Sequence, residues 1–500
     1  MAAIIPICAA AAIPTPADFV AMPAEQVQAL QMEVAAFRQQ TPTPERTYDF
    51  ERKVATIYRE AGRALLEKEY NRIEPEHLQD CPVRLRFMNQ EYKRRPKSHN
   101  LIGTLFGEIH LWRYLYEPIE AGERSIFPLE MQLGIEAGLA TPALAERVGL
   151  WSAEHEQEQV RTLLQQEHSV WWSVTSLRKV AASLRNGLAS FREEAQVAKL
   201  LELLEKANQS KGKHRPVLAA GRDGIHVPIR SEGYHEGSAA TVSVLNRRGQ
   251  RLGTVYLGQM PESGQGTLSA QLTSLLTKVL AEWQARGQTA PRLEYITDGG
   301  SHPKEYYQRV LRHMADPWRA GQKLCWQWVV DFWHACAYVH HLAEGLFGEG
   351  ARAEGWFQKW RRWLRDRHQG TAQVLRSAMW HYNNSGKLSK VKEALFWKGY
   401  RYLRKHAVWM KYAEYRRQGL QIGSGVTEAA CKTVFAERLK RSGMTWCREG
   451  GQVILDLRVL RLSSVWSKAH QAYLRSRQQA ITVKRASHGV ARGQILKFAA

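Results

Sequence analysis

The middle of the chain alternates strand-like segments with amphipathic helical ones. Residues 217–230, 239–245 and 251–257 carry strand patterns, and Asn246-Arg-Arg-Gly-Gln between the last two predicts a hairpin turn. In residues 267–286 leucines recur every three or four positions, which predicts a helix with one apolar face. We therefore expect three antiparallel strands followed by a helix.

Two further strands and two helices continue this order. Residues 293–297 predict a strand that ends on Asp298-Gly-Gly, and residues 324–330 predict another. Helical patterns at 306–314 and 332–346 follow these strands in turn. Three antiparallel strands, helix, strand, helix, strand is the order of an RNase H-like fold, so we expect an α/β core with a mixed five-stranded sheet.

The region before this core is predicted to be mostly helical. Residues 46–74 have apolar positions at helix spacing, and residues 128–204 have the pattern of several helices. Within residues 128–204, a turn predicted at Gly149 separates two short helices, and the first of these is capped near Thr141. The pair fits a helix-turn-helix or an ordinary helical bundle, and spacing leaves both open.

A small antiparallel β-ribbon is expected near residues 83–116. Val83-Arg-Leu-Arg-Phe alternates, residues 105–116 alternate again, and Lys97-Ser-His-Asn predicts the turn between them.

Charge narrows the class of partner. The chain has 71 Lys and Arg against 48 Asp and Glu, a formal net charge of +23. Residues 351–420 contain 17 basic and four acidic residues, interleaved with six tryptophans. Neutralising phosphates releases counterions, so nucleic acid is the expected partner. We expect most of the tryptophans to pack in a helical core and one or two to be free to stack on an unpaired base.

The six cysteines include no Cys-x-x-Cys pair, which argues against a disulfide framework and favours a reducing compartment. No run of about 18 apolar residues is present, so no membrane span is expected. The apolar start of the chain lacks a basic region and contains Pro6 and Pro14, so it is interpreted as a tail rather than a signal peptide.

Six regions follow from these patterns. They are a flexible tail at 1–45, a mostly helical DNA-binding region at 46–205, the first part of the core at 206–346, a basic Trp-rich helical insertion at 347–420, the last core helix and a C-terminal helix at 421–465, and a basic tail at 466–500.

Two aspartates lie where the expected sheet could present them together. Asp223 is in the first core strand, and Asp298 is at the carboxyl end of the fourth, the edge at which open α/β sheets bind ligands. Two-metal cleavage of a phosphodiester needs carboxylates from different elements, and Mg²⁺ prefers oxygen ligands. Asp223 and Asp298 are therefore candidate metal ligands.

Ile422-Gly-Ser-Gly-Val-Thr-Glu428 supplies a third carboxylate. The glycines interrupt the preceding helix and Ser424 is a suitable N-cap, so Glu428 falls in the first turn of a new helix, where the dipole favours its charge. Glu437 is the rival. Nine residues at about 100° each place it on the opposite helix face, so we select Glu428.

Four segments resemble the ISKra-type insertion-sequence transposases, bacterial relatives of the Mutator-like group. These are Asp298-Gly, Val330-Asp-Phe-Trp-His-Ala, Ile422-Gly-Ser-Gly-Val-Thr-Glu and Arg438-Leu-Lys-Arg-Ser-Gly-Met-Thr-Trp. The last two are the most specific. The similarity covers about residues 205–465 and extends weakly to 128–183.

The resemblance implies a DDE catalytic core with an all-helical insertion between the second Asp and the Glu. Asp223, Asp298 and Glu428 match the three acidic positions that would bind Mg²⁺ or Mn²⁺. Asp331 competes for the second position, and Cys325 with His334 corresponds to a Cys/His motif near the site. Relatives often carry a zinc element before the core, but Cys81 is the single cysteine of the matching region here, so four ligands are not present.

The function implied is metal-dependent cleavage and strand transfer at the ends of an insertion sequence, in the bacterial cytoplasm at the nucleoid. Because two ends must be joined, a homodimer or larger assembly on DNA is expected. Lys432, Arg438, Lys440 and Arg441 are candidate phosphate contacts beside Glu428. Two alternatives remain: a transposase-derived DNA-binding protein without catalysis, and an RNase H-like nuclease that cuts without joining.

Overall fold

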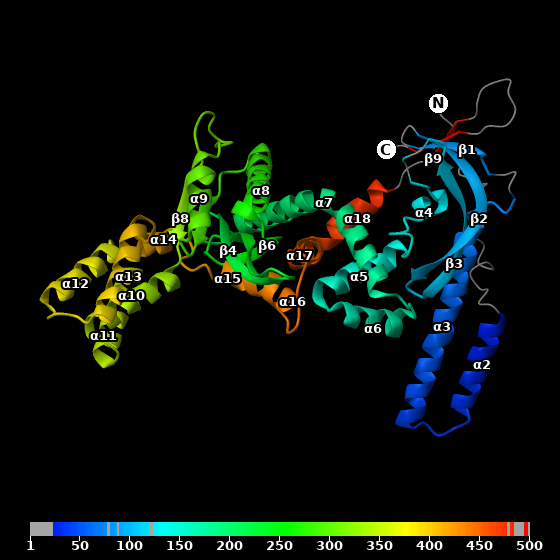
Figure 1. The fold of residues 1–500 in the computed structure, drawn as a ribbon, viewed down its shortest axis with the longest axis horizontal. Helices are drawn as coiled ribbons and strands as arrows, with labels where there is room; N and C mark the ends of the chain where they lie inside the picture. The colour runs from blue at the N-terminus through cyan, green and yellow to red at the C-terminus, as the bar shows by residue number, and fades with distance from the viewer. Residues whose placement is uncertain are drawn as a thin grey trace. The chain divides into compact units, whose positions relative to one another are not determined.

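The computed structural model describes residues 24–77, 81–87, 90–120, 122, 124–477, 481–484 and 495–498. The chain divides into two compact units, 1–188 with 470–500, and 189–469; the boundary lies within helix α7 (Val174–Gln209) (Figure 1). Among the described helices, none is both long and apolar enough to cross a lipid bilayer.

The second unit is built on a mixed five-stranded sheet with the order β6-β5-β4-β7-β8. The strands are β4 (Val217–Ile229), β5 (Gly233–Leu245), β6 (Arg251–Gln259), β7 (Arg292–Thr297) and β8 (Trp326–Val330). β4, β5 and β6 pair antiparallel, whereas β7 pairs parallel with both β4 and β8. The predicted strands and their mixed sheet are confirmed, and so is the hairpin turn, in which the Asn246 side chain accepts hydrogen bonds from the backbone N–H groups of Arg248 and Gln250.

Helix α8 (Gly266–Ala285) covers one face of this sheet. All the apolar positions of its predicted stripe are buried: Leu268, Leu272, Leu275, Leu276, Val279, Leu280 and Trp283. From β4, the buried Arg222 guanidinium donates to Ser269 and Gln265, at 2.9 Å each. Because side chains alternate along a strand, Gly221 and Asp223 belong to the opposite face.

That opposite face is covered by α15 (Gly425–Ala430), the π-helical segment η5 (Cys431–Ala436), α16 (Glu437–Leu439) and α17 (Arg448–Leu462). Glycines in three strands let these helices approach closely. A Cβ at Gly221 would lie 2.1 Å from Thr427 Oγ1, one at Gly237 would lie 3.0 Å from the Phe435 ring, and one at Gly258 would lie 3.2 Å from Val434. The Thr427 hydroxyl also hydrogen-bonds Thr241 on β5 at 2.8 Å.

Residues 332–417 are helical, as predicted. The helices are α10 (Phe332–Phe347), α11 (Ala351–Asp366), α12 (Gly370–Asn384), α13 (Lys390–His406), the short η4 (Ala407–Trp409) and α14 (Tyr412–Arg417). Trp356 and Trp360 are buried in the core, Trp363, Trp397 and Trp409 pack against it, and Trp380 is 61% exposed.

The helix predicted at 306–314 is displaced toward the N-terminus. α9 spans Ser301–Arg309 and is followed by the short η3 (Leu311–His313). The reason is local: the Asp298 carboxylate accepts the Gly300 N–H at 2.8 Å, a side-chain turn that starts the helix at the next residue.

The first unit contains a second five-stranded sheet, of order β3-β2-β1-β10-β9. Its strands are β1 (Arg84–Phe87), β2 (Gln90–Thr104), β3 (Gly107–Pro118), β9 (Ile481–Lys484) and β10 (Ile495–Phe498). Side chains of α3 (Pro44–Arg72) and the residues after it cover the edge of β3. Glu67, Asn71 and Glu74 accept hydrogen bonds from successive outward N–H groups of that strand, those of His110, Trp112 and Tyr114.

The other helices of this unit are α2 (Ala24–Arg38), α4 (Pro128–Gln132), α5 (Pro142–Glu154), α6 (Gln157–His168) and most of α18 (Trp466–Ser476). The helix predicted at 46–74 is confirmed as α3. The turn predicted at Gly149 is wrong, because Gly149 is buried inside α5 and the chain turns at His155 and Glu156.

One other prediction for the first unit is wrong, and two regions expected as tails contain regular structure. The ribbon is present, but residues 97–100 lie within β2, and the turn is at Thr104–Gly107, where Gly107 has a φ of +124° and Thr104 hydrogen-bonds both Phe106 and Gly107. The tail expected at 1–45 includes helix α2, while residues 1–23 lie outside the described part. The tail expected at 466–500 contains α18 and two strands.

Candidate functional site

Asp223 and Asp298 are brought together by the register of two neighbouring strands. β4 and β7 are parallel, and Gly221 pairs with Ile296. Two residues further along each strand direction lie Asp223, on β4, and Asp298, directly after β7. Equal offsets from a paired position in parallel strands place the two aspartates side by side, where β7 ends and β4 continues.

Backbone groups and α13 hold the Asp298 turn. Its carboxylate accepts the Gly300 N–H, and its backbone carbonyl accepts the Tyr402 hydroxyl at 2.7 Å. Tyr402 in turn stacks on Tyr338 of α10, with ring centroids 3.6 Å apart. The all-helical segment therefore contributes directly to the position of a candidate ligand.

Glu428 lies in the first turn of α15, as predicted, and its side chain is exposed. Ser424 occupies the N-cap position, but its hydroxyl caps no backbone N–H; it donates to Glu428 Oε1 at 2.7 Å. The contacts of Thr427 with Gly221 and Thr241 hold α15 against β4 and β5, so Glu428 is on the same face of the sheet as Asp223.

The electrostatic surroundings of Asp223 include the other two carboxylates. The pKa of Asp223 is raised to about 6, first by burial and further by the negative charges of Asp298 and Glu428. Hydrogen bonds from the Gly224 N–H (2.8 Å) and the Cys431 thiol (3.5 Å) act in the opposite direction. A cation bound beside Asp223 would therefore be stabilised by the negative charges of its neighbours.

A cavity of about 230 Å³ opens beside the two aspartates. It is lined by both of them and by Arg222, Gly224, His226, Glu236, Gln265, Gly300, Ser301, His302 and Pro303. Glu236, which accepts a hydrogen bond from Gln265 at 3.0 Å, and the two histidines were not predicted. The sequence signal for them is weak, since each is a lone polar residue whose place at the cavity depends on the pairing of β4 with β5 and β7.

The donor set suits a hard divalent cation, because Asp223, Asp298 and Glu428 offer carboxylate oxygens only. In the described part of the chain, however, no three Asp, Glu, His or Cys side chains converge closely enough to hold a metal ion. Glu428, an exposed side chain held by Ser424, is the member that would have to turn inward. Ligand chemistry therefore fits Mg²⁺ or Mn²⁺, whereas the present side-chain positions do not yet enclose an ion.

Asp331 is fully buried and has its own partners. One carboxylate oxygen accepts the His334 N–H at 2.6 Å, which caps α10, and the other accepts the backbone N–H of Ser424. It therefore connects α10 to the loop that leads into Glu428. Of the two candidates for the second Asp position, Asp298 is the one beside Asp223 at the cavity.

Glu437 is directed toward Arg458 of α17, although the regular helix geometry assumed in predicting its face is absent. The helix between Glu428 and Glu437 includes η5, and a π-helix has more residues per turn than the 100° rule assumes. Glu437 is paired with Arg458 at 3.3 Å.

The four candidate phosphate contacts differ in exposure. Lys432 and Lys440 are exposed, and Arg441 is half-buried and donates to the Glu437 carbonyl at 2.7 Å. Arg438 is 1% exposed and lies over the Trp446 ring, 5.2 Å from its centroid. Arg438 is thus a core cation in this structure, and the prediction that it contacts DNA is corrected.

Cys325 and His334 are not brought together. The five-residue strand β8 separates them: exposed Cys325 precedes it, and His334 follows it in α10. A strand of five residues is about 16 Å long. The His334 ring instead packs edge-on against Tyr338 and Tyr402.

The chain matches no protein-family model, and the search of curated proteins finds no relative.

Proposed function

We propose that this chain is a DNA transposase of the DDE type, which cleaves and joins DNA strands with Mg²⁺ or Mn²⁺ held by Asp223, Asp298 and Glu428. The observation that carries the proposal is the parallel register of β4 and β7, which sets two aspartates side by side, with α15 bringing a glutamate to the same face of the sheet.

The order of elements adds support. Three antiparallel strands, a helix and two parallel strands are the arrangement expected of an RNase H-like core. The helices between Asp298 and Glu428 have the place that the resemblance to ISKra-type transposases implies for an insertion, and they are rich in basic residues. DNA is the partner that a chain of net charge +23 favours, and the bacterial cytoplasm is where such an enzyme would meet it.

When bound, divalent ions would activate the attacking oxygen and stabilise the leaving one. The protein's own residues would position those ions and the DNA. Asp223, Asp298 and Glu428 would be the ligands, Asp331 would fix the loop before Glu428, and exposed Lys432 and Lys440 would contact phosphates beside the site, with Arg441 near them.

The test is an oligonucleotide cleavage and strand-transfer assay with Mg²⁺. Asp223→Asn, Asp298→Asn and Glu428→Gln should each reduce the rate by at least about 10³-fold, since each removes a metal ligand, and should leave DNA affinity within a few-fold. An active Glu428→Gln protein would show that Glu428 is not a metal ligand.

The Asp331→Asn variant tests whether Asp331 or Asp298 is the second aspartate ligand. An amide at this position directs an N–H toward one of the two backbone N–H groups that Asp331 now binds, so the loop before Glu428 should loosen. We expect a partial loss of rate, with Asp298→Asn inactive. The reverse pattern would move the site to Asp331.

Two other functions give different results in the same assay. A DNA-binding protein without catalysis would bind the DNA and give no metal-dependent product. A nuclease would yield cut ends and no joined ends.

A further inference from the structure

The sheet of the first unit has a cluster of aromatic side chains that is open to solvent. His99 of β2 pairs with Trp112 of β3, and Leu101 pairs with His110. Paired residues of neighbouring strands share a face of the sheet, and so do alternate residues of one strand, so these four side chains form one patch. The His99 ring centroid lies 4.6 Å from that of Trp112 and 5.4 Å from that of His110.

The same face of the sheet is packed on either side of this patch. Tyr114, two residues after Trp112, is buried in a small core. In the other direction, a Cβ at Gly103 would lie 2.7 Å from the Trp172 ring. Between these two packed regions, Leu101 is 44% and Trp112 is 45% exposed. Contiguous exposed rings of this kind are more typical of a binding surface than are single exposed residues.

Positive charge in the first unit is concentrated in the strands of this sheet. Residues 81–118, which contain β1, β2 and β3, have seven basic and three acidic residues, and residues 471–500, which contain β9 and β10, have six and none. Residues 24–80 have eight basic and eleven acidic residues, and residues 119–188 have six and nine. A polyanion is therefore attracted to the sheet in preference to the helices.

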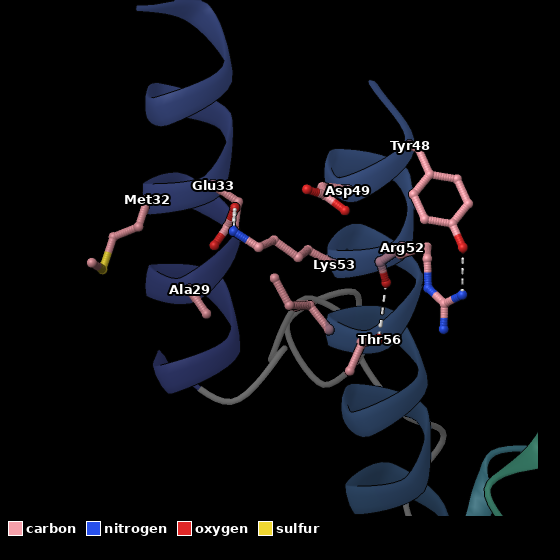
Figure 2. Close-up of a pocket in the computed structure, with 9 residues that line it drawn as sticks. Ala29, Met32, Glu33, Tyr48, Asp49, Arg52, Lys53 and Thr56 are labelled. Atoms are coloured by element: carbon pink, nitrogen blue, oxygen red, sulfur yellow. Dashed lines mark hydrogen bonds and ion pairs between the residues drawn. The ribbon is translucent and has the colours of Figure 1, made fainter. Parts of the chain in front are cut away.

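The helices of this unit use their cations within the protein. Figure 2 shows Lys53 of α3 paired with Glu33 of α2 across the groove between these helices, at 3.0 Å. Helix α6, the second helix of the α5–α6 pair, contains two glutamates and one arginine, and this Arg161 donates to Glu158 at 2.6 Å. Neither pair of helices therefore offers the excess of cations that a nucleic-acid surface needs.

Cations lie beside the exposed rings. Lys97 Nζ and the Arg94 guanidinium carbon are 5.6 and 5.9 Å from the centroid of the Tyr114 ring, next to Trp112 on β3. Bases stack on exposed aromatic rings when nearby cations hold the phosphates, and this stacking tolerates any sequence because every base has a flat face. In a duplex those faces are covered by neighbouring base pairs, so a patch of rings selects unpaired bases.

We propose that the face of β2 and β3 that bears His99, His110 and Trp112 binds single-stranded DNA. Trp112 stacks on an unpaired base, and Lys97 and Arg94 contact the adjacent phosphates. The choice of DNA rests on the proposed function, whereas the stacking surface needs none of the three carboxylates. Binding to it is therefore measured with EDTA present, and Asp223→Asn should leave it unchanged whether or not the proposed chemistry is right.

Fluorescence anisotropy of the full chain with a labelled oligothymidine of about 12 nucleotides tests the proposal. Trp112→Ala should weaken binding by at least about fivefold, the lower end of the effect of one stacked base. Trp112→Phe keeps a ring and should retain most of the affinity. Tyr48→Ala is the matched control, because Tyr48 is a 58% exposed ring on α3, and its replacement should leave the affinity unchanged.

An abasic strand of the same length separates stacking from charge. The parent protein should bind it more weakly than oligothymidine, and Trp112→Ala should bind it as the parent does, because no base is present to stack. Unchanged oligothymidine affinity in Trp112→Ala, or an equal loss for both strands, would overturn the proposal. A change in self-association with DNA affinity unchanged would make the patch a protein contact instead.

Photo-cross-linking gives a readout that needs no substitution. An oligonucleotide that carries 5-iododeoxyuridine should cross-link to peptides from residues 97–113 of the parent protein. Cross-links confined to residues 351–420 would place the single strand on the second unit and contradict the proposal.

Discussion

Glu294 on β7 is a carboxyl with no solvent exposure. Its Oε2 accepts the Gln421 N–H at 3.3 Å, while Oε1 has no partner within the described residues. Burial raises the pKa of this group from 4.5 to about 8. At neutral pH the folded protein therefore holds Glu294 protonated, under the loop that leads to Glu428.

The sign of the resulting pH dependence follows from proton uptake. Between pH 4.5 and about 8 the folded state keeps the proton that the unfolded chain has released, so the free energy of unfolding falls with rising pH. The contribution of this group is at most about 1.4 kcal/mol per pH unit.

We predict that Glu294→Gln, a neutral side chain of the same shape, makes thermal unfolding less sensitive to pH across this window and raises the melting temperature at pH 8. Melting curves of both proteins from pH 5 to 8 measure it. Parallel curves for the two proteins would contradict the assignment of a buried, protonated carboxyl.

At the scale of elements, the packing of α15 against the sheet depends on a glycine in β4, which has no side chain. Gly221 leaves room for Thr427, whose hydroxyl would be 2.1 Å from an added Cβ. We predict that Gly221→Ala displaces α15, costs about 1–3 kcal/mol of unfolding free energy and lowers the strand-transfer rate without changing DNA affinity. Denaturant melts and the cleavage assay measure the two effects.

Two further variants test the cause. Gly221→Ala combined with Thr427→Ala removes the atom in the way, so the pair should be more stable than the sum of the single effects. Gly355→Ala, in α11 with nothing within 4 Å of its Cβ, should be neutral or stabilising. Simple additivity would show that Thr427 is not the obstacle.

The π-helical segment after α15 shows what sequence patterns cannot predict. Periodicity gave the strands and α8, because one face of each is buried against a continuous core. It could not give η5, since no local residue pattern specifies a π-helix, and the angle assigned to Glu437 depended on regular α geometry. Nor could it give β9 and β10, because β10 pairs with β1, about 400 residues earlier in the chain.

Within the candidate site, the carboxylates could be predicted and their surroundings could not. Asp223 and Asp298 stand at strand positions that the alternation reveals. The second hydrogen bond of Asp331 depends on where Ser424 lies, and the burial of Arg438 depends on Trp446 folding under it. These are contacts between segments, which a single sequence does not display.

At the scale of the whole molecule, charge is distributed unevenly. Residues 351–420 hold 17 basic and four acidic residues, while residues 24–72 are balanced. Arg401, Arg404 and Lys405 are exposed on α13, the helix whose Tyr402 holds the Asp298 turn. If DNA reaches the candidate site, its backbone should pass over these cations.

We predict that DNA affinity falls steeply with salt, and that changing Arg401, Arg404 and Lys405 together to Gln lowers the slope of log affinity against log salt. Each lost phosphate contact reduces the slope by about 0.9, so the triple variant should lose up to about 2.7.

The control variant changes Arg38, Lys68 and Arg72 to Gln. These residues are exposed on α2 and α3, where basic and acidic residues are equal in number, and their replacement should leave the slope unchanged. Fluorescence anisotropy at 50–300 mM salt, roughly the range in which such contacts dominate, measures all three proteins. An equal reduction of the slope in the two variants would mean that DNA affinity depends on net charge alone. A reduction in the control variant only would place the DNA on the first unit instead of the helices around Asp298.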